Sequence, residues 1–142
     1  MEPYRYCVSL RITHPEIDPD EISQVLGLEA VATWKAGDPR ATPKGQALDG
    51  IRKESFWRHH PHGDSKISSE AQCLEDYLEN LTSMLSSHKD FFAHIFETGG
   101  HIEYFIGLFS ENSIGSILRA SLLRKIVALN IDLSFDIYAY PE

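Results

Sequence analysis

The residues best suited to recognition chemistry lie in one segment, 29–66, where basic and aromatic side chains gather. Residues 31–66 hold seven Lys or Arg and four Asp or Glu, a net charge of +3, so the rest of a chain of net charge −8 carries −11. Both tryptophans lie here too. Arginine beside tryptophan suits an anionic or aromatic ligand, a single-stranded nucleic acid or a protein partner. The candidate binding residues are Trp34, Lys35, Arg40, Arg52, Trp57 and Arg58.

A simpler interpretation of this basic-aromatic segment is structural. Buried tryptophan is common in folded proteins, and for Trp34 and Trp57 we favour burial over ligand contact. The charged side chains would then be solvated parts of an irregular loop. A shared binding surface requires that Arg40 and Arg52 lie on the same side of the molecule.

Three histidines invite a metal-site interpretation, because imidazole is a common zinc ligand. His59, His60 and His62 are followed or separated by Pro61 and Gly63, which indicate a loop, and no Cys or carboxylate lies at a familiar ligand spacing. They are weak candidates, and the sequence predicts no bound metal and no cofactor. It also contains no Gly-rich phosphate loop and no Gly-x-Ser-x-Gly turn, so we assign no catalytic residue.

The elements that must position these residues begin with an alternating strand over 4–12. A helix follows over 18–27, with Asp18 as its cap, Pro19 at its first position and Gly27 at its end. Within the irregular part, residues 31–34 and 51–59 are predicted strands. A capping box over 69–72 predicts the start of a long helix that reaches Leu85, and 90–96 predicts a shorter one.

The C-terminal part predicts a strand, a helix and a second strand. The apolar run 102–109 indicates a central strand covered on both faces. Ser113 is the expected cap of a helix over 114–129 that stops at Asn130. Residues 131–138 alternate, with Ile131, Leu133, Phe135 and Ile137 facing inward. The short connections predict two parallel strands.

The strand–helix order of residues 4–28 is echoed by residues 102–133. Two related halves of this kind predict one α+β domain over 1–142, a ferredoxin-like sandwich with a mixed or antiparallel sheet and helices packed on one face.

Composition and charge limit the setting. The sequence contains no apolar run long enough to span a bilayer and no signal-peptide pattern, and its two cysteines, Cys7 and Cys73, are typical of a reduced, cytoplasmic protein. A net charge of −8 argues against binding of nucleic acid or anionic lipid over the whole surface. The exposed edges of such a sheet leave monomer and homodimer both open.

The chain resembles a known family. The resemblance rests on HPEIDPDEISQVLGL at 14–28, Trp34 with Lys35 and Gly37, Ser55 with Trp57, the long amphipathic helix and SFDIY at 134–138. Together these resemble the domain of unknown function family 4279, which groups small, mainly bacterial, single-domain proteins. The resemblance implies a single α+β domain and no particular activity. The His-His-Pro-His stretch at 59–62 does not belong to the family pattern.

Two functional hypotheses follow. The first is a non-enzymatic protein-binding module of the immunity or regulatory type, since the chain is small and acidic and has no acid–base constellation in its sequence. The alternative is a domain that binds a small anionic ligand or a nucleotide through the basic-aromatic segment. The sequence leaves catalysis open but favours a role without it.

Overall fold

The alternating residues near the N-terminus form the central strand of the fold. In the computed structural model, which describes residues 3–139, this strand is β1, Arg5–His14. Tyr6, Val8, Leu10 and Ile12 point to one side of the sheet, where each is at most 1% exposed. The odd-numbered residues between them are half-buried on the other side. The predicted half-buried strand is confirmed.

The main sheet is built around β1. Its order is β2 (Ala32–Trp34), β5 (Ser55–His59), β1, β7 (His101–Phe109) and β8 (Ile131–Tyr138), and β6 (Ile67–Ser68) pairs with the start of β1. The pairing of β7 with β8 is parallel and the other pairings in this sheet are antiparallel, so the sheet is mixed. A separate hairpin joins β3 (Pro39–Ala41) to β4 (Ala47–Ile51).

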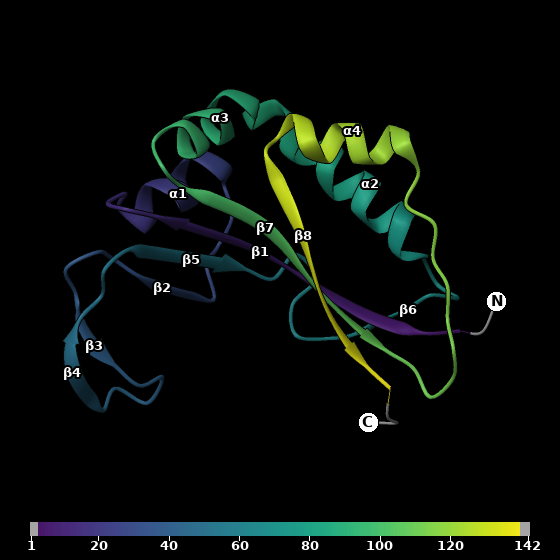
Figure 1. The fold of residues 1–142 in the computed structure, drawn as a ribbon, viewed down its shortest axis with the longest axis horizontal. Coiled ribbons are helices and arrows are strands. Elements are labelled where there is room, and N and C mark those ends of the chain that lie inside the picture. The colour runs from purple at the N-terminus through teal and green to yellow at the C-terminus, as the bar shows by residue number, and fades with distance from the viewer. Residues whose placement is uncertain (1–2, 140–142) are drawn as a thin grey trace.

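The helices lie on one face of this sheet (Figure 1). They are α1 (Pro19–Leu26), α2 (Leu74–Leu85), α3 (Lys89–Glu97) and α4 (Ala120–Ala128), with a 3₁₀ turn, η1 (Ser86–His88), between α2 and α3. The predicted α+β class is confirmed. The ferredoxin-like detail is not confirmed, because β7 and β8 are direct neighbours rather than strands of a split βαβ unit.

The core fills the space between the helices and the sheet. Trp57, Tyr104 and Phe92 are completely buried there, from β5, β7 and α3. The hydroxyls of Tyr104 and Thr82 lie 2.8 Å apart, so this polar pair is satisfied inside the core. No helix among residues 3–139 combines the length and the apolar character that crossing a membrane requires.

The first helix begins and ends as its sequence predicts. The Asp18 side chain accepts a hydrogen bond from the Asp20 N–H at 3.0 Å, and Pro19 occupies the first turn. Gly27 takes a left-handed conformation with φ of 67°, and its N–H donates to the Ser23 carbonyl.

The predicted capping box over 69–72 is wrong. Helix α2 begins only at Leu74, after Cys73, which makes no side-chain capping bond. The Ser69 hydroxyl instead accepts a hydrogen bond from the Tyr4 N–H at 2.9 Å. Strand β6 pairs with β1 immediately before Ser69. The serine hydroxyl is therefore bonded to β1's side of the sheet rather than to the helix, and the helix begins five residues later, at Leu74.

The C-terminal unit confirms the parallel strands but corrects three details. Residues 110–119 are not helical, and Ser113 caps nothing; the Arg119 N–H donates to the Glu75 carboxylate, which ties this segment to α2. Strand β7 is covered by helices on one face only, and Phe105 on the other face is half-buried. Ile131 and Leu133 face inward as predicted, but Phe135 and Ile137 on this edge strand are 41% and 71% exposed. Asn130 is left-handed, φ 58°, as predicted.

Candidate functional site

A hollow of about 690 Å³ lies where the β3–β4 hairpin meets one end of the main sheet. Its charged lining comes from Arg40, Arg52, Lys53 and Glu54, and its aromatic lining from Trp34 and Phe56. The hairpin stands apart from the helices in Figure 1, beside β2 and β5. The hollow therefore opens on the side of the molecule that the helical layer does not cover.

The hairpin owes its shape to turn residues. At its tip the Thr42 N–H donates to the Gln46 carbonyl, the Gly45 N–H donates to the Thr42 carbonyl, and the Thr42 hydroxyl accepts from the Gln46 N–H. At its base the Gly37 N–H donates to the Arg52 carbonyl and the Arg52 N–H to the Asp38 carbonyl. These bonds place the side chain of Arg52 over the sheet.

Arg52 is fixed on an aromatic platform. Trp34 stacks on Phe56, with ring centroids 4.6 Å apart and an interplanar angle of 24°. The guanidinium carbon of Arg52 lies 3.8 Å from the centroid of the Trp34 ring, and one of its Nη atoms donates to the Ala41 carbonyl at 3.1 Å. A guanidinium held in this way loses little conformational freedom when it binds an anion.

Arg40 is held by the opposite strand of the hairpin. Its Nη1 donates to the Asp49 carbonyl at 3.1 Å. This bond uses one of the five N–H groups of a guanidinium, as does the bond from Arg52 to Ala41. Arg40 and Arg52 thus line one hollow, and the requirement that they lie on the same side of the molecule is met.

The other predicted binding residues are not in the hollow. Trp57 is 0% exposed, and its indole N–H donates to the Ser23 hydroxyl at 2.9 Å, so it belongs to the core. Lys35 is exposed at the start of a tight turn, and its backbone N–H donates to the Asp38 carboxylate. Arg58 is half-buried on the helix-free face of the sheet, beyond the hollow. Lys53, Glu54 and Phe56 line the hollow but were not predicted as binding residues. The turn residues at 42–46 are the sequence feature that indicates the hairpin above the hollow.

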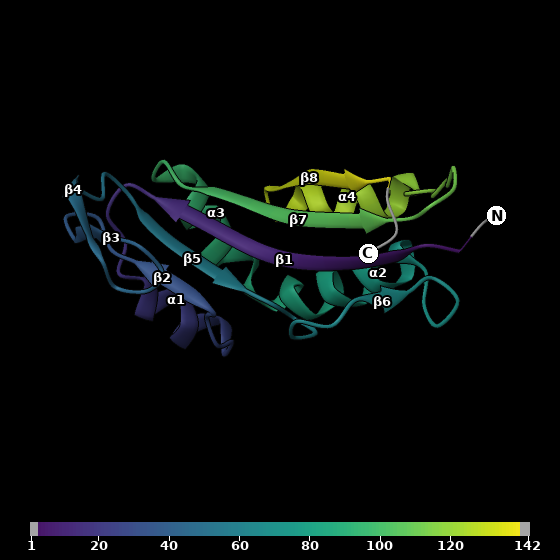
Figure 2. The ribbon, with the colours of Figure 1, turned by 90° about the horizontal axis from the view of Figure 1, so that it is seen from below.

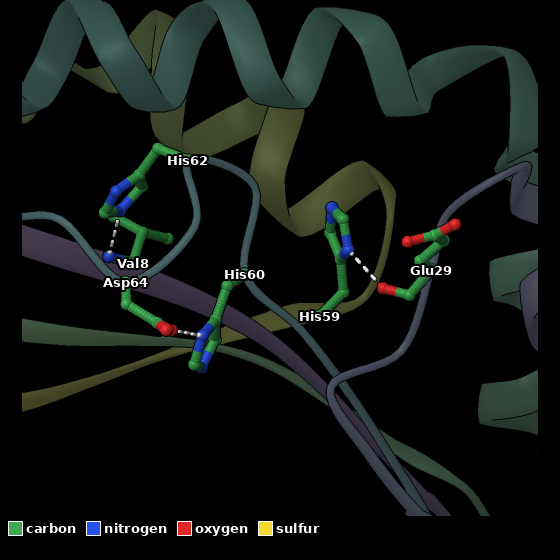
Figure 3. Close-up of polar contacts among 6 residues, drawn as sticks. All are labelled: Val8, Glu29, His59, His60, His62 and Asp64. Atoms are coloured by element: carbon green, nitrogen blue, oxygen red, sulfur yellow. Dashed lines mark hydrogen bonds and ion pairs between the residues drawn. The ribbon is translucent and has the colours of Figure 1, made fainter.

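The three histidines have three different partners (Figure 3). Nδ1 of His59 lies 2.6 Å from the Glu29 carbonyl, and Nδ1 of His60 lies 3.1 Å from the Asp64 carboxylate. His62 accepts from the Val8 N–H through Nε2 at 3.0 Å. Among residues 3–139, no group of three His, Cys, Asp or Glu side chains is placed to hold a metal ion.

His62 gives stability a pH dependence. Burial lowers its pKa, and the bond that Nε2 accepts from the Val8 N–H requires the neutral imidazole. Burial also lowers the pKa of His14, whose Nδ1 accepts from two backbone N–H groups. As the pH falls, the unfolded chain binds these two protons before the folded chain does. The free energy of unfolding is therefore unaffected by the two histidines well above a pH of about 6.5, and it decreases as the pH drops below that value.

We therefore expect the free energy of unfolding, measured by urea titration, to be lower at pH 5.5 than at pH 7.5. His62→Gln keeps an oxygen that can accept from Val8 and should reduce this difference. The same change at His88, in η1, is the matched control and should leave the difference as it is. An identical pH dependence in wild type and His62→Gln would contradict the assignment.

Comparison with known proteins supplies a family. The model of a family described as "Domain of unknown function (DUF4279)" matches residues 2–140, nearly the whole chain. No curated protein and no solved structure matches the chain. The resemblance drawn from the sequence is thus confirmed: the chain belongs to the family of domain of unknown function 4279.

Proposed function

We propose that this member of the 4279 family is a non-enzymatic binding module that takes a small anionic ligand, such as a nucleotide, into the hollow beneath the β3–β4 hairpin. The observation that carries the proposal is the Arg52 guanidinium, held over Trp34 and against the Ala41 carbonyl on the same hollow as Arg40. Charge-assisted hydrogen bonds from guanidinium to phosphate or carboxylate are among the strongest in proteins.

The dimensions and charge of the hollow support a small ligand. A volume of about 690 Å³ is within the range of small-molecule sites. The lining carries three basic side chains and one acidic one, in a chain of net charge −8. A small anion meets mainly the local positive charge, whereas a long polyanion also meets the acidic remainder of the surface.

The proposal is tested by titrating the protein with inorganic phosphate and with adenosine monophosphate, followed by calorimetry and tryptophan fluorescence. Arg52→Gln should weaken binding of both about 10- to 100-fold, because a hydrogen bond to a charged group is lost. Arg124→Gln, on the exposed side of α4, is the control and should bind like wild type. Binding of equal strength to wild type and Arg52→Gln would overturn the proposal.

The second candidate is a protein-binding module of the immunity or regulatory type. Large apolar side chains are exposed on α4 and β8, with Val127 68% and Ile137 71% exposed, and a protein partner would remove them from water. A pull-down compares wild type with an Arg40→Glu/Arg52→Glu double variant of the hollow. A protein partner that both chains retain supports the contact at α4 and β8, whereas a small ligand that only wild type retains supports the hollow. We also infer a cytoplasmic setting, supported by the two free cysteines, Cys7 and Cys73.

A further inference from the structure

The helix-free face of the sheet carries an ordered row of charges. Register pairs Arg58 on β5 with Arg11 on β1, Arg11 with Glu103 on β7, and Glu103 with Asp132 on β8. Read across the strands, the row is positive, positive, negative, negative. Figure 2 views the sheet from below, and there β1 and β7 lie in front of the helices with no other element over them.

These charges are only partly satisfied within one chain. The Nε atoms of Arg11 and Arg58 are shielded from solvent and have no hydrogen-bond partner in the described part of the chain. Arg11 approaches Glu103 only to 3.9 Å, although their side chains are just 27% and 23% exposed, and Asp132 lies 3.0 Å from His101. The parts of the Arg11 and Glu103 side chains that stay exposed are open to contacts with charges of opposite sign.

A second copy of the chain supplies those partners by symmetry. A two-fold axis parallel to the strands, running between β1 and β7, turns the row onto itself in reverse order. Arg58 then faces Asp132 of the second copy, and Arg11 faces Glu103 of the second copy. An axis across the strands would instead bring like charges together. The row is therefore complementary to itself in one orientation.

We propose that this chain forms a homodimer by packing the helix-free faces of two sheets against each other. The half-buried Phe105 carries the Arg11 guanidinium on its ring, with 3.8 Å from the guanidinium carbon to the ring centroid, and so holds Arg11 in the row. Aligned sheets commonly pack face to face about 10 Å apart. The row shares no residue with the hollow, whose Thr13 and Phe56 lie two residues further along β1 and β5 on the same face.

The charge pattern favours this occupant over nucleic acid. A single strand laid on Arg58 and Arg11 would also meet the carboxylates of Glu103 and Asp132 on the neighbouring strands. Phosphates would be repelled over half of the row. A second copy meets both halves with opposite charge.

Two charge reversals test the pairing. Arg58→Glu and Asp132→Lys each create two like-charge contacts in a symmetric dimer, and each should weaken self-association at least about 100-fold. In a dimer of one chain of each variant, every facing pair along the row again has opposite charges. We expect native mass spectrometry and light scattering to show a dimer of wild type, monomers of each variant, and a dimer of the mixture that contains one chain of each kind.

The controls separate loss of pairing from loss of folding. Each variant must give the far-ultraviolet circular dichroism of wild type, and Arg124→Glu on α4 must leave the wild-type dimer unchanged. A wild type that remains monomeric at millimolar concentration would overturn the proposal. So would a dimer that both single variants retain, because another surface would then be responsible, and so would a mixture of folded variants that fails to pair.

Discussion

Replacing Trp57 with alanine is expected to lower the free energy of unfolding by about 3–5 kcal/mol. Trp57 has no exposed surface, and its ring is among the largest completely buried side chains. The substitution leaves a cavity between β5 and α1 and removes the hydrogen bond from the indole to Ser23. Because domains of this size are stable by only about 5–15 kcal/mol, much of the variant should unfold on mild heating.

The comparison that gives this prediction its meaning is Trp34→Ala. Trp34 stacks on Phe56 and carries Arg52, but it is only partly buried, so we expect a loss of about 1–2 kcal/mol. Both losses are measured by urea unfolding followed by circular dichroism. Equal losses at the two positions would show that Trp57 is not the core residue that the structure describes.

The sequence alone does not separate these two tryptophans. Both lie in the basic-aromatic segment, and both were candidates for ligand contact and for burial. Their difference comes from strand alternation within β5: Ser55 and Trp57 face the helices, whereas Phe56 and Arg58 face the open side. That choice is made by the pairing of β5 with β1, more than 40 residues earlier, which local residue patterns do not contain.

Local signals succeeded where no distant group competed for them. Asp18, Pro19 and Gly27 are all used by α1 itself, and the predicted helix is correct. Ser69 opens a capping-box pattern and Ser113 is an expected cap, but Ser69 binds the N–H of Tyr4 and the segment after Ser113 is tied to α2 through Glu75. Tertiary hydrogen bonds therefore moved the starts of both α2 and α4.

The candidate sites depend even more on distant contacts. The hollow requires a hairpin whose two strands are three and five residues long, too short to give a clear periodicity. The charge row on the open face joins four strands, and its order follows from strand order and register rather than from any motif. Sequence patterns could predict that Arg11 and Asp132 face away from the core, but not that they lie in one row.

Replacing Gly100 with alanine is expected to destabilise the fold by about 3 kcal/mol, toward the upper end of the range for overpacking. A Cβ atom at this position would lie 2.6 Å from the Ile95 carbonyl oxygen, 2.6 Å from the Ile95 Cγ2 and 3.0 Å from the His14 ring. The carbonyl is fixed, because it accepts the Gly100 N–H at 2.8 Å where α3 turns into β7. Relieving the clash between the alanine Cβ and Ile95 therefore requires movement of the backbone.

Gly107→Ala, in the middle of β7, is the matched control. There the new Cβ would meet the Cys7 Sγ at 3.0 Å and the edge of the Phe109 ring at 3.1 Å, which are side-chain atoms that can rotate away. Alanine also reduces the conformational entropy of the unfolded chain, so we expect a net loss of less than about 1 kcal/mol. Urea unfolding of both variants checks the difference. Equal losses would mean that the turn before β7 adapts, and that Gly100 is present for a reason other than the close approach of α3 to the sheet.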